Sequence, residues 1–259
     1  MDLRLSGRRA LVSGGSKGIG FASAKLLAQE GCDVVLVSRN AADLERAKAE
    51  IEAGASGRRI EIEACDLSQD EVSVRLAERY GGRIDILVNN AGAIPGGTLG
   101  DIDQARWRAA WDLKLFGYIG MTRAFYARMA ERKSGVIVNV IGAAGERMSA
   151  SYIAGSTANA GLMAFTRALG AASPTDGVRV VGVNPGPVST GRLETLQRGR
   201  AKSLLGDPDR WREMLTDLPF ARAATPDEIA AMVAFLASDL SAYTTGTIVT
   251  IDGGMSHKG

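Results

Sequence analysis

Apolar runs of strand length alternate with amphipathic helical stretches along nearly the whole chain. The apolar runs indicate seven strands, at residues 10–13, 34–37, 60–64, 84–88, 136–141, 179–183 and 247–251. Helical patterns lie among them, at residues 19–30, 42–53, 71–80, 102–133, 152–172 and 227–237. Strands that are apolar on both faces and joined by helices build a parallel sheet covered on both sides. The pattern therefore predicts an α/β fold with a doubly wound, seven-stranded parallel sheet.

One segment breaks this alternation. Residues 191–216 are charged and only weakly helical, and they follow the sixth predicted strand. They are expected to form an insertion above the carboxyl edge of the sheet, where ligands of such folds bind. We predict a mobile lid over a small substrate, and a solvated helical excursion is the alternative. No repeat or linker divides the chain elsewhere, so residues 1–259 are expected to form a single Rossmann-type domain.

Composition narrows the class of protein. Hydrophobic residues make up 46% of the chain, which is enough for a full core, and 31 basic against 29 acidic residues leave a net charge of +2 without blocks of one sign. Neither nucleic acid nor a membrane is therefore an expected partner. Residues 1–9 lack a signal-peptide core, and Cys32 and Cys65 lie in apolar runs, so a cytoplasmic protein is expected. No cluster has metal-ligand spacing, and no metal is predicted.

A glycine-rich turn follows the first predicted strand. Residues 13–20 read Ser-Gly-Gly-Ser-Lys-Gly-Ile-Gly, and the residues after them have a helical pattern. Glycines at such a junction allow a tight turn and a close approach of backbone N–H groups to a pyrophosphate, which the helix N-terminus also attracts. The turn therefore predicts a dinucleotide cofactor, bound by Gly14, Ser16, Lys17, Gly18, Ile19 and Gly20.

The end of the second predicted strand bears on the choice of cofactor. A dehydrogenase that prefers NAD places an acid there to bind the adenosine ribose. This chain has Ser38 and Arg39 at that point, and Lys17 lies in the glycine-rich turn. Two cations and a hydroxyl suit a 2′-phosphate, although Arg39 could also be a solvated loop residue. The sequence therefore predicts NADP(H).

Further motifs occur in the order of one known family. Asp66-Leu67 follows the third predicted strand, Asn89-Asn90-Ala91-Gly92 the fourth, Pro185-Gly186 with Thr190 the sixth, and Asp252-Gly253-Gly254 the last. With the glycine-rich turn, they make the chain resemble a short-chain dehydrogenase/reductase over essentially its whole length. The resemblance implies an oxidoreductase and adds cofactor contacts: Asp66 and Leu67 at the adenine, Asn90, Ala91 and Gly92 on the adenosine-ribose side, and Pro185, Gly186, Val188 and Thr190 at the nicotinamide.

The catalytic residues of that family are absent at their expected positions. The family uses a Ser, a Tyr, a Lys four residues after the Tyr, and an Asn on the preceding long helix. With the register anchored on Thr166-Arg167-Ala168-Leu169, the Tyr position, eleven residues earlier, is Gly155. The other positions are Asn159 for Lys, Gly142 for Ser and Lys114 for Asn. The chain thus resembles an atypical member, and its two glycines are expected to open volume for a larger or differently posed substrate.

Two nearby residues could rebuild the proton relay. If the helix has begun by residue 152, Tyr152 shares a face with Gly155, and its phenol could reach the space that this glycine leaves. Lys114 could tune a phenol or donate the proton itself, if burial lowers its pKa. The structural alternatives are an amphipathic anchor for Tyr152 and an ion-pair partner for Lys114. Asn159 is expected at the cofactor ribose as a neutral hydrogen-bonding substitute.

Three functions are compatible with these residues. The first is an NADP(H)-dependent oxidoreductase that acts on a small carbonyl or alcohol through a non-standard relay, since positioning supplies much of the acceleration. The second is a catalytically silent pseudoenzyme or regulatory subunit that binds NADP(H), and the third is non-redox chemistry. The resemblance also implies a homo-oligomer, a dimer or tetramer, assembled through the fourth and fifth predicted helices.

Overall fold

Seven strands form one sheet in the computed structural model, which describes residues 2–257. The strands are β1 (Arg9–Ser13), β2 (Asp33–Ser38), β3 (Ile60–Ala64), β4 (Ile86–Asn89), β5 (Gly135–Val140), β6 (Val178–Pro185) and β7 (Ile248–Ile251). Every neighbouring pair is parallel, in the order β3-β2-β1-β4-β5-β6-β7. The predicted seven-stranded parallel sheet is confirmed.

The strand order changes direction at β1, which lies between β2 and β4. In an open parallel sheet of this kind, the connections on either side of the reversal leave a crevice at the carboxyl ends of the strands, and ligands bind there. The segments that follow β1, β2, β4, β5 and β6 all begin at this edge. The topology therefore brings the sequence motifs to one end of the molecule.

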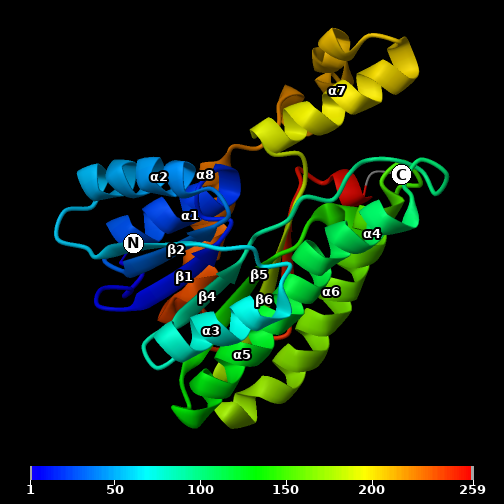
Figure 1. Cartoon of the computed structure of the whole chain (residues 1–259). Helices are drawn as coiled ribbons and strands as arrows, with labels where there is room; N and C mark the ends of the chain where they lie inside the picture. The colour runs from blue at the N-terminus through cyan, green and yellow to red at the C-terminus, as the bar shows by residue number, and fades with distance from the viewer. Residues whose placement is uncertain (1, 258–259) are drawn as a thin grey trace.

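Helices cover both faces of the sheet (Figure 1). One face carries α1 (Gly18–Gln29), α2 (Ala41–Gly54) and α8 (Pro226–Ala237), and the other carries α3 (Asp70–Tyr80), α4 (Gln104–Trp111), α5 (Gly117–Glu131) and α6 (Ile153–Ala172). The remaining long helix is α7 (Gly191–Leu205). Short helical turns occur at Ala143–Gly145, Ser173–Asp176, Pro208–Leu215 (η4), Pro219–Ala221, Asp239–Ser241 and Met255–His257.

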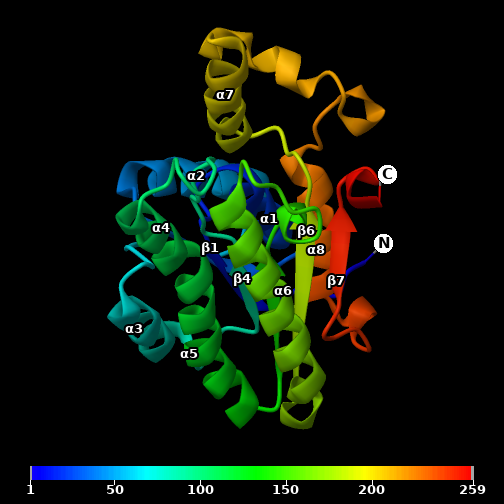
Figure 2. The same ribbon diagram turned by 90° about the vertical axis from the view of Figure 1, so that its right-hand side faces the viewer.

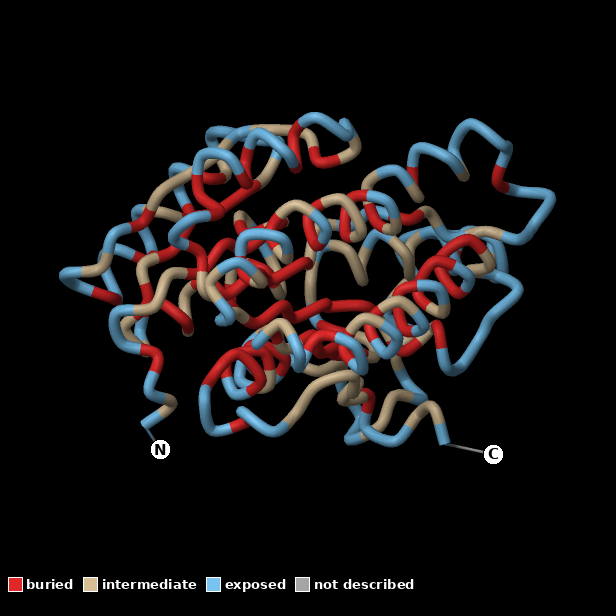
Figure 3. The backbone as a smooth tube through the Cα atoms, turned by 90° about the horizontal axis from the view of Figure 1, so that it is seen from below, coloured by how far each residue is buried: buried red, intermediate tan, exposed pale blue. Residues whose placement is uncertain are grey.

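Alternation along the strands sends side chains into two cores. Ala10 and Val12 of β1 pack on the side of α1, α2 and α8, whereas Leu11 packs on the side of α3 and α5. All three are fully buried, and buried backbone runs through the middle of the molecule in Figure 3. This is the arrangement expected of strands that are apolar on both faces.

Two helices differ from their predicted form. Residues 102–133 are not one regular helix, because α4 and α5 are joined by a π-helical turn, η1 (Asp112–Phe116), in which the Gly117 N–H donates to the Asp112 carbonyl. The helix predicted from residue 152 begins at Ile153, and Tyr152 precedes it with non-helical angles (φ −140°, ψ 38°). Both differences lie beside the predicted catalytic positions.

Residues 191–216 form an arm rather than part of the layered body. The arm consists of α7 and η4, and it stands beyond the carboxyl edge of the sheet in both side views (Figures 1 and 2). Its base is closed by two backbone hydrogen bonds, from Ser189 N to Ala224 O (2.8 Å) and from Ala224 N to Pro187 O (2.9 Å). The arm thus lies beyond the carboxyl edge of the sheet, and its role as a substrate lid stays a prediction.

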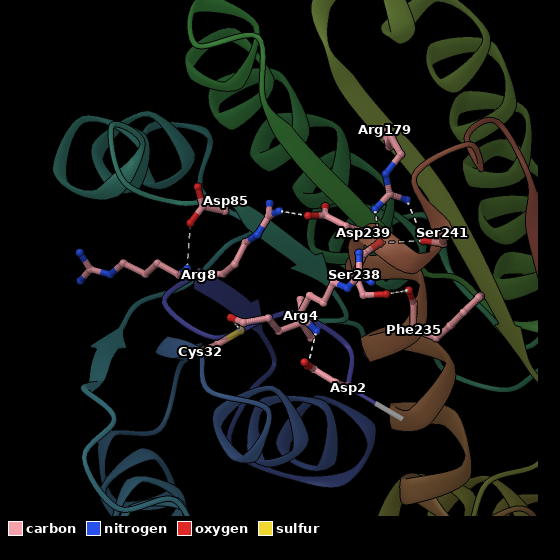
Figure 4. A network of polar contacts seen from close by, with 12 residues as sticks. Asp2, Arg4, Arg8, Cys32, Asp85, Arg179, Phe235, Ser238, Asp239 and Ser241 are labelled. Atoms are coloured by element: carbon pink, nitrogen blue, oxygen red, sulfur yellow. Dashed lines mark hydrogen bonds and ion pairs between the residues drawn. The ribbon is translucent and has the colours of Figure 1, made fainter.

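The opposite end of the sheet is fastened by polar contacts. Arg8 pairs with Asp239 at 2.5 Å, and Arg179 donates to the Ser238 carbonyl and the Ser241 hydroxyl (Figure 4). These contacts hold the turn after α8 against β1 and β6. Within residues 2–257, no helix is long and apolar enough to span a membrane.

Candidate active site

The glycine-rich turn connects β1 to α1 and is shaped for a phosphate group. Gly14 adopts φ +65°, which side-chain-bearing residues rarely adopt, and a Cβ at Gly20 would lie 2.3 Å from the Gly14 carbonyl oxygen. Lys17 is the N-cap of α1 but gives no side-chain cap to the helix. The first N–H groups of α1 are therefore open to an external anion, as a pyrophosphate site requires. The turn fits a dinucleotide.

The end of β4 is fixed to this turn. The backbone N–H groups of Asn90 and Ala91 donate to the Ser13 hydroxyl at 2.9 and 3.1 Å. The Asn90 side chain donates to the carbonyls of Ser13 and Gly14 at 3.2 and 3.3 Å. Asn90 thus joins the two loops that flank the reversal point, and Ala91 and Gly92 follow directly at the crevice.

The adenosine side of the site contains the predicted cations Lys17 and Arg39. It also contains an acid, Asp43, which lies beyond the end of β2 in the first turn of α2. The Ser16 hydroxyl donates to the Ser38 hydroxyl at 3.1 Å, and Arg39 is exposed without an ion pair in the described part of the chain. Lys17 pairs with Asp43, on the first turn of α2, at 2.6 Å. This pairing holds the pKa of Asp43 below its usual value. A 2′-phosphate would compete with Asp43 for Lys17, whereas Arg39 is free to meet it.

Asp66 lies next to these groups. Its carboxylate accepts hydrogen bonds from the backbone N–H and hydroxyl of Ser68, at 3.0 and 2.8 Å, and Leu67 between them is buried. Burial alone would raise the pKa of Asp66, but the Ser68 hydrogen bonds and the nearby Arg39 bring it below its usual value. The carboxylate is therefore charged and held in one orientation, as an adenine acceptor would need.

The end of β6 holds the residues that are predicted to contact the nicotinamide. A Cβ at Gly186, after Pro185, would lie 2.8 Å from the Cα of Asp252, so only glycine allows this approach. Val188 is buried, and the Thr190 hydroxyl caps α7 by accepting from Leu193 N at 3.3 Å. The Thr190 methyl lies 3.2 Å from the Cβ position of Gly18. The base of the arm therefore contacts the glycine-rich turn.

Lys114 lies in the π-helical turn with its ammonium group buried. The side chain is 8% exposed, and Nζ donates to the Val140 carbonyl and the Tyr118 hydroxyl, both at 2.9 Å. The Tyr118 hydroxyl in turn donates to the same carbonyl at 2.8 Å. No carboxylate pairs with Lys114 among residues 2–257, so its interpretation as an ion-pair partner is wrong.

The surroundings of Lys114 change its acidity. Burial, with a smaller contribution from the nearby Arg192, lowers the pKa of Lys114 to about 7. Burial raises the pKa of Tyr118 well above its ordinary value, so that phenol stays neutral. An amine that titrates near neutral pH can donate a proton and regain it, as a general acid must.

Tyr152 covers Gly155. A Cβ at Gly155 would lie 2.0 Å from Cε1 and 2.1 Å from Cζ of the Tyr152 ring. The ring thus fills the space that the glycine leaves, as predicted, and it also packs against the apolar cluster around Ile94 and Ala154, as an anchor would. The Cζ atom, which bears the hydroxyl, therefore lies where the side chain of residue 155 would begin.

Gly142 and Asn159 form a second matched pair. Gly142 adopts φ +134°, and a Cβ there would lie 2.8 Å from Nδ2 of the buried Asn159. The Asn159 amide forms no hydrogen bond within residues 2–257. The expectation that the two glycines open volume for a larger substrate is wrong, because the Tyr152 ring and the Asn159 amide fill that space.

Sequence reasoning missed Tyr118 and Arg192. Tyr118 lies four residues after Lys114, a spacing that places both side chains on one helix face and could have indicated the contact. Arg192 begins α7, and its guanidinium donates to the Ile94 carbonyl in the loop after β4. No local signal in the sequence connects these two segments, which are 98 residues apart.

Known proteins are similar to this chain over nearly its whole length. The family model of enoyl-(acyl carrier protein) reductases matches residues 14–256. Acetoacetyl-CoA reductase of Allochromatium vinosum is 35% identical over 254 residues, which cover 96% of this chain and 98% of that protein.

Solved structures share the fold over the whole chain. L-sorbose reductase of Gluconobacter frateurii, complexed with NADPH and L-sorbose, has a TM-score of 0.89 and 28% identity, and each chain is covered completely. A xylitol dehydrogenase bound to NAD⁺ has a TM-score of 0.91 and 26% identity over 97% of this chain and 100% of that one. Similar structures thus hold either cofactor.

Proposed function

The chain belongs to the short-chain dehydrogenase/reductase family, and from this premise we propose that it is an NADP(H)-dependent oxidoreductase acting on a small carbonyl or alcohol through a non-standard proton relay. We infer that it is an atypical member, in which Lys114, Gly142, Gly155 and Asn159 stand where the family has Asn, Ser, Tyr and Lys. Relatives named as acetoacetyl-CoA reductase and L-sorbose reductase support a carbonyl substrate.

The buried ammonium of Lys114 is the observation that carries this proposal. A lysine without an acidic partner is costly to bury, because the charged form loses its hydration. Two oxygens hold Nζ in place, the Val140 carbonyl and the Tyr118 hydroxyl. Val140 ends β5, two residues before Gly142, so the ammonium lies at the same strand end as the position proposed for the family Ser. A group so placed, with a pKa of about 7, suits a general acid.

Lys114 and Tyr118 have different roles in the proposed reaction. The nicotinamide, when bound, supplies the hydride that reduces the carbonyl carbon. Two N–H groups of Lys114 donate to Val140 and Tyr118. Lys114 donates its third proton to the carbonyl oxygen of the substrate, and water reprotonates the resulting neutral amine before the next turnover. Tyr118 accepts one N–H of Lys114 and donates to Val140, so it positions the amine without giving up its own proton. In the direction of alcohol oxidation, neutral Lys114 accepts the proton.

We assign Tyr152 to the pocket wall and Asn159 to the cofactor ribose. The Tyr152 hydroxyl forms no hydrogen bond within the described residues, and its ring packs in the apolar cluster with Ile94 and Ala154. The Asn159 amide is likewise free of protein partners and lies beside Gly142. A neutral amide there can bind a hydroxyl but cannot activate a phenol.

The preference for NADP(H) rests on Arg39. Its guanidinium is exposed without an ion pair in residues 2–257, beside the Ser38 hydroxyl at the end of β2. Lys17 contributes less, because Asp43 already pairs with it. We expect Arg39→Ala to weaken NADP⁺ binding about 10- to 100-fold and to leave NAD⁺ binding unchanged, as measured by calorimetry.

One assay tests the function. NADPH oxidation is followed with a panel of small aldehydes, ketones and oxo acids, for the wild type and for Lys114→Ala and Tyr152→Phe. At least one substrate should turn over, and Lys114→Ala should lower kcat about 10²- to 10⁴-fold without weakening NADP⁺ binding. Tyr152→Phe should keep activity within a few-fold. The reverse order of effects would assign the proton to Tyr152.

A catalytically silent NADP(H)-binding protein is the second candidate. It is favoured by Gly155 and Asn159, because the described residues contain no lysine that could activate a phenol at the family positions. Tight NADP⁺ binding, with no turnover of any member of the panel, would establish this function instead.

We further propose a cytoplasmic homo-oligomer, a dimer or tetramer, in which residues 191–216 close over the substrate. The oligomer is supported by an apolar face near α4, where Leu99 and Phe116 are 69% and 52% exposed beside Trp107 and Trp111. Light scattering of the wild type and of Phe116→Asp tests the assembly, since a charge on this face should release monomers.

A further inference from the structure

Two cations, Lys114 and Arg192, contact the loop that follows β4. The Lys114 stem packs against Gly92, with its Cδ 2.6 Å from the position of a Cβ there. The Arg192 guanidinium, from the first turn of α7, donates to the Ile94 carbonyl two residues further along. Lys114 comes from the body of the protein and Arg192 from the arm, so the loop separates them by only a short stretch of backbone.

Arg192 has no acidic partner in the described structure, although its side chain is half-buried. Its guanidinium has five N–H donors, of which the described structure uses one, and no carboxylate pairs with it in residues 2–257. Arg198, on the same helix, pairs with both Glu194 at 2.9 Å and Asp209 at 2.5 Å. Arg210 also has an acidic partner, Glu213, at 2.7 Å. The remaining arginines of the arm, Arg200 and Arg212, are exposed to solvent. Arg192 differs from them because it is half-buried at the crevice and has no acidic partner.

Glu146, an acid in the loop after β5 at this end of the sheet, is already engaged. Glu146 accepts from the Asn184 amide at 3.2 Å and from the Thr250 hydroxyl at 2.9 Å, on the far side of β6. Two partly or fully buried cations near each other, without a neutralising acid, are unfavourable because each charged group loses hydration and gains no opposite charge. A ligand that brings a negative charge would remove that cost, and the planar guanidinium matches the two oxygens of a carboxylate.

We propose that the substrate carries a carboxylate, which Arg192 binds while the reacting carbonyl oxygen faces Lys114. This inference rests on the oxidoreductase proposed above and specifies its substrate as a short oxo acid or hydroxy acid. A carboxylate is favoured over a phosphoryl group because its two oxygens match the single guanidinium fork of Arg192. The arm would then contribute to substrate binding, because it positions the guanidinium of Arg192 at the crevice.

The test uses matched ligands and the NADP⁺-loaded protein. Each ligand set consists of an oxo acid, its methyl ester and the corresponding oxo phosphonate. The sets differ in chain length, with two to four carbons between the carbonyl and the acid. Binding is measured by calorimetry, and turnover is measured by NADPH oxidation. The wild type should bind at least one acid about 10- to 100-fold more tightly than its ester, as expected for a charge-assisted pair.

Variants on one helix supply the controls. Arg192→Gln should abolish the preference for acid over ester, and Arg192→Lys should keep part of it, because the charge remains but the fork is lost. Arg200→Gln removes the same charge from an exposed position of α7 and should leave the preference unchanged. NADP⁺ binding should be equal in all variants, and this result would show that the variants fold.

The outcomes separate this inference from the proposed function. Equal binding of acid and ester, no detectable binding of either in any set, or an acid preference that survives Arg192→Gln would overturn the carboxylate site. A phosphonate that binds more tightly than the carboxylate would also overturn it. An acid preference that depends on Arg192, without turnover of any acid, would support the site and contradict the redox function alone.

Discussion

Lys114 shows how one buried charge can organise a site. Its ammonium has a backbone carbonyl and a neutral phenol as partners, and neither compensates its charge. The pKa falls because burial, and to a lesser extent Arg192, disfavours the protonated form. The same burial that makes the residue costly in the folded state suits it to the proposed role of proton donor near neutral pH.

The free-energy cost of burying protonated Lys114 predicts that the stability of the protein depends on pH. The pKa of Lys114 is about 7 in the folded protein and 10.5 in the unfolded chain. Between these values the unfolded state binds more protons, so this residue makes the free energy of unfolding rise with pH. Lys114→Met should therefore stabilise the protein by on the order of 3 kcal/mol at pH 6.5 and by little at pH 10.5.

Urea unfolding at the two pH values measures this difference. Lys202→Met, which removes an exposed lysine of α7, should change stability by less than about 0.5 kcal/mol at both pH values. A stabilisation by Lys114→Met that is equal at pH 6.5 and pH 10.5 would mean that Lys114 is not protonated at a cost in the folded state.

The pairing of Gly155 with Tyr152 gives a second prediction at the residue scale. Gly155→Ala places a methyl group 2.0 Å from the Tyr152 ring and should cost about 1–3 kcal/mol of stability. In Tyr152→Ala that methyl group has room, so the cost should largely vanish in the double variant. Chemical unfolding of the two single variants and the double variant measures the coupling.

Gly161 on the same helix is the matched control. A Cβ there would lie 3.7 Å from Leu115 Cδ1, an ordinary contact, so Gly161→Ala should stabilise α6 by about 0.5–1 kcal/mol. If Gly155→Ala behaves like Gly161→Ala, the ring does not occupy the proposed space.

The elements beside the site are the ones that the sequence pattern predicts least well. The apolar period of residues 102–133 is continuous, so it indicates one helix, yet the chain inserts the wide turn of η1 where Lys114 lies. Such turns depend on tertiary packing: Trp111 donates to the Ala154 carbonyl of α6 at 3.0 Å and fixes the end of α4 there. A periodicity argument cannot detect a contact between two helices.

The arm is the element with the clearest expected motion. Its base is closed at Val188 and Ala224, whereas its far end stands off the body in Figure 2. Hydrogen exchange of residues 191–205 should slow in the presence of NADP⁺ and an oxo acid, because closure buries α7 against the crevice. Exchange in α3, on the opposite side of the molecule, should not change. Unchanged exchange in α7 would exclude its role as a lid.

At the scale of the whole molecule, the sheet and the cofactor end could be predicted because their signals are local. Each strand is an apolar run, and the glycine-rich turn carries its own geometry, as the positive φ of Gly14 shows. The choice between Tyr152 and Lys114 could not be made from sequence, because it depends on burial and on distant partners. Asp43 and Arg192 were missed for the same reason, since each acts on a residue of another element.

The pH dependence of NADPH oxidation tests the central claim, that Lys114 donates the proton, most directly. A donor with a pKa of about 7 is protonated below that pH, so the turnover rate with the best substrate of the panel should be constant at low pH and fall as the pH rises through about 7. Lys114→Ala should remove this transition along with most of the activity, and Tyr152→Phe should retain it. A rate that shows no transition near pH 7, or a transition that disappears in Tyr152→Phe, would contradict the account.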